Sequence, residues 1–189
     1  VETPRELTEE EIDGLLDAFG RSARRAMEAG FDGVEVHGAH GFLLNQFTSP
    51  LSNMRRDRYG GSFMNRIRFP LEVVEKVREV VGGRIPVFYR MGADDMSPGG
   101  FTLEEGKKFA VKLVDAGVQV IDVSGGMCGS RPAELKGQGF FIHLAEGVKS
   151  VVDVPVIGVG GVRDPFFADE VVRSGRADLV AVGRAMLED

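Results

Sequence analysis

Cysteine and tryptophan are the scarcest residue types in this chain of 189 residues, which has one cysteine and no tryptophan. Because Cys128 has no second cysteine to pair with, the sequence excludes an internal disulfide and a metal site built from several cysteines. Unpaired thiols are usual in a reducing compartment, so we expect a cytoplasmic protein. No apolar run is long enough to span a bilayer, and no signal peptide or lipidation motif is recognisable, so we expect no membrane partner.

Positive charge is also in short supply. The chain has 23 Lys and Arg against 29 Asp and Glu, which gives a formal net charge of −6. Nucleic acids demand a basic surface, so we expect no nucleic-acid partner. The hydrophobic fraction of 43% and the charged fraction of 28% are those of a folded globular protein. We expect a single domain covering residues 1–189.

Short apolar runs alternate with amphipathic segments along the chain, and glycines follow most of the apolar runs. This order predicts a parallel α/β fold. Thr8 with Glu11 and Thr102 with Glu105 have the spacing of capping boxes at helix starts, and Asp164 before a proline predicts another helix start. We expect strands at residues 33–36, 86–91, 119–123, 154–159 and 178–182, and helices at residues 8–29, 65–81, from 102, 141–151 and 165–174.

A repeated grammar of helix end, glycine, strand and glycine-containing loop runs through "EAGFDGVEVHG", "DAGVQVIDVSGG" and "RSGRADLVAVGR". Such quasi-repeats are typical of a (β/α)₈ TIM barrel. An open doubly wound sheet is the alternative, but no glycine-rich dinucleotide fingerprint follows the first strand. A barrel needs eight strands and we count five, so we interpret the chain as strands four to eight of a longer protein.

Charged and aromatic polar residues stand at the carboxyl ends of the first two strands, where barrel active sites lie. His37 and His40 could be metal ligands, a base with its helper, or hydrogen-bond donors; Glu35 is the only further ligand nearby, which disfavours a metal. Arg90 interrupts an apolar strand, and a buried arginine needs a partner. That partner could be Asp94 or an electron-rich ligand.

The loops after the last two strands carry Gly160 and Gly161, and then Gly183 and Arg184. Phosphate groups in TIM barrels often bind between these two loops. Glycines allow backbone N–H groups to approach a phosphate, and the arginine fork matches its oxygens. The alternative is that the glycines only make turns and that Arg184 pairs with a carboxylate.

The stretch "FDGVEVHGAHGFLLNQFTSPLSNMRRDRYGGSFMNRIRF" closely resembles the strand-four signature of the Old Yellow Enzyme family. The stretches "VIDVSGG", "VIGVGGVRDP" and "ADLVAVGRAMLED" resemble its sixth, seventh and eighth strands, so the resemblance covers essentially the whole chain. It implies an oxidoreductase that binds FMN, is recharged by NAD(P)H, and passes a hydride between the flavin and an electron-poor small molecule.

The resemblance also implies roles for individual residues. His37 and His40 would hydrogen-bond a carbonyl or nitro oxygen of the substrate, and Arg90 would contact the N1/C2 carbonyl edge of the flavin. The FMN phosphate would be held by Gly160, Gly161, Gly183 and Arg184. A mainly structural role is implied for the loop residues Arg55, Asp57, Tyr59, Gly60, Gly61, Asn65 and Arg66.

Two departures from the family pattern bear on mechanism. Phe42 stands where family ene-reductases usually carry the tyrosine that gives a proton to the substrate, and the front half of the barrel is outside this chain. We therefore expect the missing half of the barrel, or a second copy, as a partner. Two other hypotheses stay open, namely a flavin-free phosphate-binding lyase or isomerase and a non-catalytic half-barrel that serves assembly.

Overall fold

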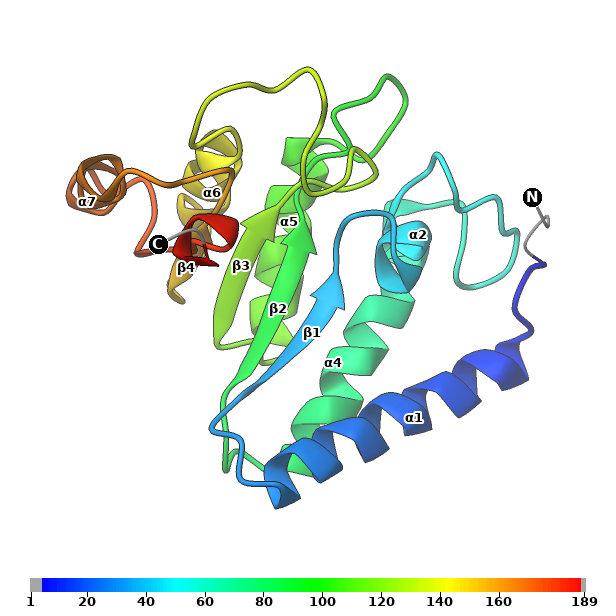
Figure 1. Cartoon of the computed structure of the whole chain (residues 1–189). Helices are drawn as coiled ribbons and strands as arrows, with labels where there is room; N and C mark the ends of the chain where they lie inside the picture. Colours follow the sequence, from blue (N-terminus) through cyan, green and yellow to red (C-terminus); the bar gives the residue numbers. More distant parts are fainter. Residues whose placement is uncertain (1–4, 188–189) are drawn as a thin grey trace.

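The computed structural model describes residues 5–187 and contains one parallel sheet with helices packed against it (Figure 1). The elements follow in the order α1 (Glu9–Glu28), β1 (Val34–Gly38), α2 (Leu43–Thr48), α3 (Phe63–Arg66), α4 (Arg68–Val81), β2 (Val87–Gly92), α5 (Leu103–Asp115), β3 (Val120–Ser124), α6 (Ile142–Lys149), β4 (Val156–Gly158), α7 (Pro165–Arg173), β5 (Leu179–Val180) and the 3₁₀ helix η1 (Arg184–Leu187).

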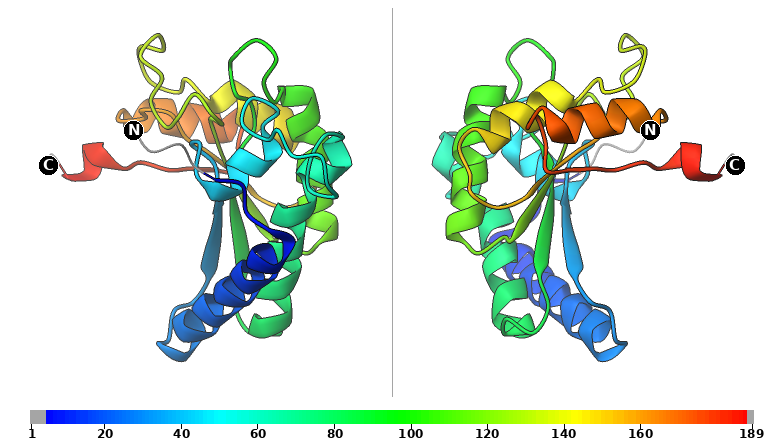
Figure 2. Two further views of the ribbon diagram at one scale, coloured as in Figure 1. Left: turned by 90° about the vertical axis from the view of Figure 1, so that its right-hand side faces the viewer. Right: turned by 90° about the vertical axis from the view of Figure 1, so that its left-hand side faces the viewer.

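The five strands pair in sequence order, β1-β2-β3-β4-β5, and every pairing is parallel. Helices α4 and α5 cover one face of β1, β2 and β3, whereas no helix among residues 5–187 covers the opposite face of these strands (Figure 2). Successive residues of each strand point to opposite faces, and Val36, Tyr89 and Ile121 are buried on the face that the helices cover. Because every pairing is parallel, all five strands end at one edge of the sheet, as the sequence predicts.

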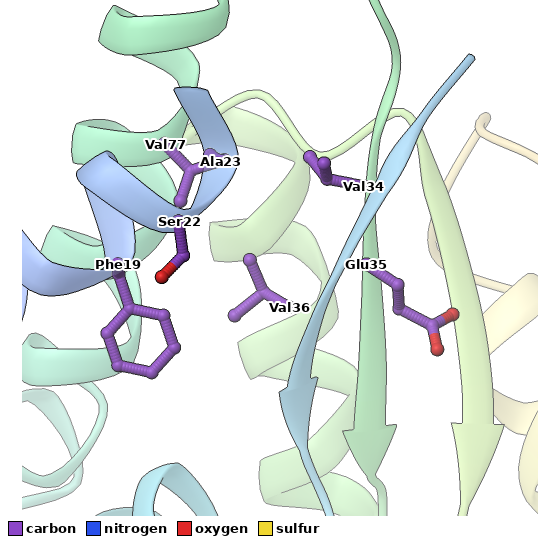
Figure 3. Close-up of a pocket in the computed structure, with 7 residues that line it drawn as sticks. All are labelled: Phe19, Ser22, Ala23, Val34, Glu35, Val36 and Val77. Carbon is purple, nitrogen blue, oxygen red and sulfur yellow. The ribbon is translucent and has the colours of Figure 1, made fainter. Parts of the chain in front are cut away.

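The side chains of β1 alternate between the two faces of the sheet. A groove of about 210 Å³ lies between α1 and β1, and Phe19 and Val36 point into it, whereas Glu35 points away on the other side of the strand (Figure 3). Glu35 therefore lies on the opposite face of β1 from Val36. The open face of the sheet is the face on which Glu35 lies.

Helix starts agree with the sequence. Thr8 and Glu11 form a complete capping box at α1, as do Thr102 and Glu105 at α5. Asp164 accepts a hydrogen bond from the backbone N–H of Phe166 at the start of α7. Each cap satisfies backbone N–H groups that the first helical turn leaves unpaired.

Several boundaries differ from those expected. The strands begin one or two residues later, and β4 and β5 are shorter than predicted, because apolar residues continue beyond the last ladder hydrogen bond. The helix expected over residues 65–81 is divided at Ile67, which caps α3 and precedes α4. Helix α2 and η1 were not predicted, since both are too short for a periodic pattern to be recognised.

The loop between α2 and α4 is held by its own basic and amide side chains. Arg66 is buried, and its guanidinium donates to the backbone oxygens of Thr48 at 2.9 Å and Gly61 at 2.8 Å while pairing with Glu105 at 2.6 Å. Arg55 donates to the backbone oxygen of Leu7 at 2.7 Å. These bonds within the chain agree with the structural role expected for this loop.

Candidate active site

Three charged or titratable side chains form a row across β1, β2 and β3. His37 is in register with Arg90, and Arg90 is in register with Asp122. Because paired residues of neighbouring strands point to the same face, all three lie on the open face of the sheet. The row is one or two residues from the carboxyl end of each strand, so it stands at the mouth of the sheet.

Arg90 pairs with Asp122 and not with Asp94. Its Nη1 donates to the Oδ2 of Asp122 at 2.6 Å. The Nε of Arg90 and the Oδ1 of Asp122 are buried and have no hydrogen-bond partner among residues 5–187. The pair therefore retains one donor and one acceptor for a group outside the described part of the chain. A buried unpaired donor is costly, which favours a ligand on this face.

The expectation that Asp94 could pair with Arg90 is wrong, because the carboxylate of Asp94 accepts hydrogen bonds from the backbone of its own loop. Its two carboxylate oxygens accept the backbone N–H groups of Met96 at 2.6 Å and Leu103 at 2.9 Å, which holds the β2–α5 loop. The neighbouring Asp95 is fully buried and ties three loops together, accepting from Ser49, Phe101 and Met127. These two carboxylates stabilise the loops around the row.

The two histidines lie together, with ring centroids 5.1 Å apart. Burial, with added repulsion from the charge of Arg90 and from His37, lowers the pKa of His40 to about 4. Burial and Arg90 also lower the pKa of His37. Both rings are therefore neutral at physiological pH, and a neutral imidazole carries one N–H donor. The ring of Phe42 meets His37 edge-on at 5.4 Å and is 62% exposed.

Two site residues were missed by sequence reasoning. Asp122 interrupts the apolar run of β3 as Arg90 interrupts that of β2, and this was a usable signal. Ser124, the last residue of β3, lies with its Oγ 2.8 Å from the Nε2 of His40. A serine in a strand carries no signal of its own, and only the pairing of the strands brings it to the histidine.

The glycines in the loops after β4 and β5 differ in backbone conformation and in the space around their Cα atoms. Gly160 and Gly161 have φ values of +127° and +66°, in the region that favours glycine, and a Cβ on either would strike the backbone or ring of Phe140. Gly183 has open space around its Cα, and Arg184 is exposed at the start of η1. Since β4 pairs with β5, the two loops leave neighbouring strands at the same edge.

Within residues 5–187, no three His, Cys, Asp or Glu side chains are grouped closely enough to hold a metal ion. Over the same residues, none of the helices combines the length and the apolar character that crossing a membrane requires. Cys128 is half-buried, and burial together with Asp95 and Asp94 raises the pKa of its thiol to about 11. This thiol is therefore not an activated nucleophile at neutral pH.

Comparison with known proteins gives the chain a family. The model of the NADH:flavin oxidoreductase / NADH oxidase family matches residues 1–189. An NADH oxidase from Thermoanaerobacter brockii is 50% identical over 98% of this chain, which spans 29% of that protein. An NADPH dehydrogenase from Geobacillus sp. (strain WCH70) is 43% identical over 99% of this chain, which spans 54% of its length.

The fold is similar to that of a solved Old Yellow Enzyme homologue from Zymomonas mobilis, with a TM-score of 0.78 and 28% identity over 97% of this chain and 51% of that one. The expected fold, part of a (β/α)₈ TIM barrel, is thereby confirmed, and the open face of the sheet is the face that lines the barrel interior. With the parallel sheet, the strand-end row and a family match over its whole length, the chain belongs to the NADH:flavin oxidoreductase / NADH oxidase family, to which the Old Yellow Enzyme type is related.

Proposed function

We propose that the complete protein is an FMN-dependent oxidoreductase of Old Yellow Enzyme type. It would transfer a hydride between reduced flavin, recharged by NADH or NADPH, and an electron-poor substrate such as an α,β-unsaturated carbonyl, a nitro compound or a quinone. The observation that carries the proposal is the row of His37, Arg90 and Asp122 at the strand ends, with His40 beside it. The names of the two relatives support the nicotinamide donor.

The residues present fit FMN. The Nε of Arg90, which has no hydrogen-bond partner among residues 5–187, is a charged donor suited to the pyrimidine edge of a flavin, where negative charge gathers on reduction. The Gly160–Gly161 turn and the exposed Arg184 would hold the phosphate from two adjacent loops. Bound FMN supplies the hydride; the side chains of this chain supply binding, orientation and polarisation.

The histidines would act on the substrate. Because His37 and His40 are neutral, each can donate one hydrogen bond to a carbonyl or nitro oxygen of the substrate. Such donors stabilise the negative charge that develops on this oxygen when a hydride reaches the conjugated carbon. Burial is the main cause that lowers the pKa of both rings, and the charge of Arg90 acts in the same direction, so this arginine bears on both the flavin side and the substrate side of the site.

This chain spans only part of its relatives, and the rest of the barrel must complete the site. The open face of β1, β2 and β3 would be closed by the first strands of the same barrel, or by a second copy of the chain. The free edge of β1 is the place where the preceding strand would pair. Residues 1–189 would then be one part of a single barrel domain and not an independent unit.

The visible absorption spectrum of the purified complete protein tests the proposal. We expect the bands of bound flavin, release of one FMN per chain on denaturation, and bleaching by NADH or NADPH. A colourless protein that cannot be reconstituted with FMN would contradict it and would favour a flavin-free lyase or isomerase or an assembly role. Intact mass measured on the same sample establishes the length of the chain that carries the flavin.

A further inference from the structure

Ser124 is tied to His40 by a hydrogen bond that links the end of β3 to the loop after β1. The Oγ of Ser124 lies 2.8 Å from the Nε2 of His40, although the residues are 84 positions apart in the sequence. The backbone N–H of His40 also donates to the backbone oxygen of Gly125 at 3.3 Å. His40 is therefore held through both its ring and its backbone by two consecutive residues.

These two hydrogen bonds hold His40 in a strained backbone conformation. His40 has a φ of 60°, a left-handed conformation that is unfavourable for a residue other than glycine. Such a conformation persists where the surroundings hold it. Next to it, Gly41 also has a positive φ, and its N–H donates to the Oδ1 of Asn45 at 2.8 Å. The loop is thus shaped to bring one ring nitrogen of His40 to Ser124.

The direction of the Ser124–His40 bond follows from burial. Ser124 is 1% exposed, and its Oγ has no hydrogen-bond partner other than His40 among residues 5–187. If Nε2 carried the proton and donated to Oγ, the serine O–H would be left buried with no acceptor. If the serine donates, its only proton is satisfied and Nε2 acts as the acceptor. The second arrangement avoids an unpaired buried donor.

The Ser124–His40 hydrogen bond also determines whether Nδ1, the other ring nitrogen of His40, carries a proton. A neutral imidazole has one proton, so a hydrogen-bond acceptor at Nε2 requires that Nδ1 carries it. Within residues 5–187, Nδ1 of His40 has no hydrogen-bond partner and is not among the fully buried unpaired atoms. It is therefore an N–H donor without a partner in this part of the chain, on a ring whose centroid lies 5.1 Å from that of His37.

We propose that Ser124 is a positioning residue that donates to Nε2 of His40, selects the Nδ1–H tautomer, and so makes His40 a donor to the substrate oxygen. The tautomer rests on this chain's own contacts, whereas its use on a substrate rests on the proposed function. A Ser124 side chain without a hydroxyl would release the ring to the other tautomer, which has an acceptor at Nδ1 where a donor is needed.

The tautomer can be measured without flavin turnover. In the complete protein labelled with ¹⁵N-histidine, two-bond ¹H–¹⁵N correlation spectra distinguish protonated from unprotonated ring nitrogens, and His40→Gln assigns the signal. We expect Nδ1–H in the wild-type protein, a shift toward Nε2–H in Ser124→Ala, and retention of Nδ1–H in Ser124→Thr. Ser174→Ala is the matched control, because that hydroxyl only caps the end of α7.

Turnover with a quinone or an enone then tests the use of the donor. We expect kcat/KM to fall by about threefold to tenfold in Ser124→Ala, the usual effect of one neutral hydrogen bond, and to recover in Ser124→Thr. An Nε2–H tautomer in the wild-type protein overturns the proposal, whether or not Ser124→Ala folds. A tautomer change with unaltered kcat/KM overturns the positioning role. If the complete protein shows the expected tautomers but binds no flavin, the proposed function is refuted and the tautomer assignment stands.

Discussion

Arg90 and Asp122 face each other across β2 and β3, with Nη1 of the arginine 2.6 Å from Oδ2 of the aspartate. The aspartate side chain is 6% exposed and the arginine side chain 22%, so the pair is largely shielded from water. Burial raises the pKa of Asp122, while Arg90 acts in the opposite direction. The positive charge offered to a ligand on this face is therefore partly balanced by the carboxylate beside it.

The charge balance between Arg90 and Asp122 predicts that Asp122→Asn changes the redox potential of the bound flavin. Removing the carboxylate leaves the charge of Arg90 uncompensated, which favours the more negative, reduced flavin. We expect the two-electron midpoint potential of the complete protein to rise by roughly 30 mV, equivalent to about 1.4 kcal/mol. Spectroscopic redox titration measures it, with the exposed Asp169→Asn on α7 as the control. An unchanged or lower potential in Asp122→Asn would show that the pair does not tune the flavin.

Arg184 is predicted to hold the FMN phosphate. A hydrogen bond to a charged group is worth about 1.5–3 kcal/mol, and we expect Arg184→Ala to weaken FMN binding by this amount. Titration of the FMN-free complete protein with FMN, followed by flavin fluorescence, gives the dissociation constant. Arg173→Ala is the matched control, since Arg173 is exposed and, within the described part of the chain, pairs with Asp169 on its own helix α7 alone. Equal affinity in the two variants would remove Arg184 from the phosphate site.

Phe42 is predicted to limit the reduction of enones, because it has no proton to give to the substrate carbon. Its ring lies edge-on to His37, so Phe42→Tyr would place a hydroxyl near the histidine pair. General acids are typically worth roughly 10²–10⁴-fold, and we expect at least about a tenfold gain in enone turnover but no gain with a quinone.

Stopped-flow measurement of flavin reoxidation with both substrates tests this prediction. Phe31→Tyr is the control, because Phe31 is 64% exposed and Phe42 is 62% exposed. If enone turnover does not rise in Phe42→Tyr, another acid from the rest of the barrel serves as the proton donor and Phe42 is a packing residue.

His40 makes the stability of the protein depend on pH. Its pKa is lowered from an ordinary 6.5 to about 4, so between these values the unfolded chain binds a proton that the folded protein does not. Its contribution to stability is therefore present above pH 6.5 and is lost as the pH falls through about 4. We expect the free energy of unfolding to decrease over this window, and to decrease less steeply in His40→Gln.

Urea unfolding followed by circular dichroism between pH 7 and pH 4 measures these slopes. His37, whose pKa is also lowered, remains in His40→Gln and contributes part of the same dependence. Identical slopes for the wild-type protein and the variant would show that folding does not lower the pKa of His40, and that burial beside Arg90 does not disfavour its charged form.

Local patterns were enough for much of the fold. The capping boxes at Thr8 and Thr102, the five apolar runs and the glycines after them depend on residues within a few positions of one another, and they recur in the structure with shifted boundaries. The motif around His37 and His40 was long enough to indicate the family. These features are determined by short-range backbone and packing preferences, which a sequence displays directly.

Contacts between distant segments were decided only by the tertiary structure. The sequence offered Asp94 as a partner for Arg90, four positions away, but strand register brings Asp122 to it from 32 positions away. The same register delivers Ser124 to His40. Parallel strands pair through backbone hydrogen bonds that are alike at every residue, so their register is set by the packing of whole strands and helices. The chemistry-bearing residues were therefore visible in the sequence, and their partners were not.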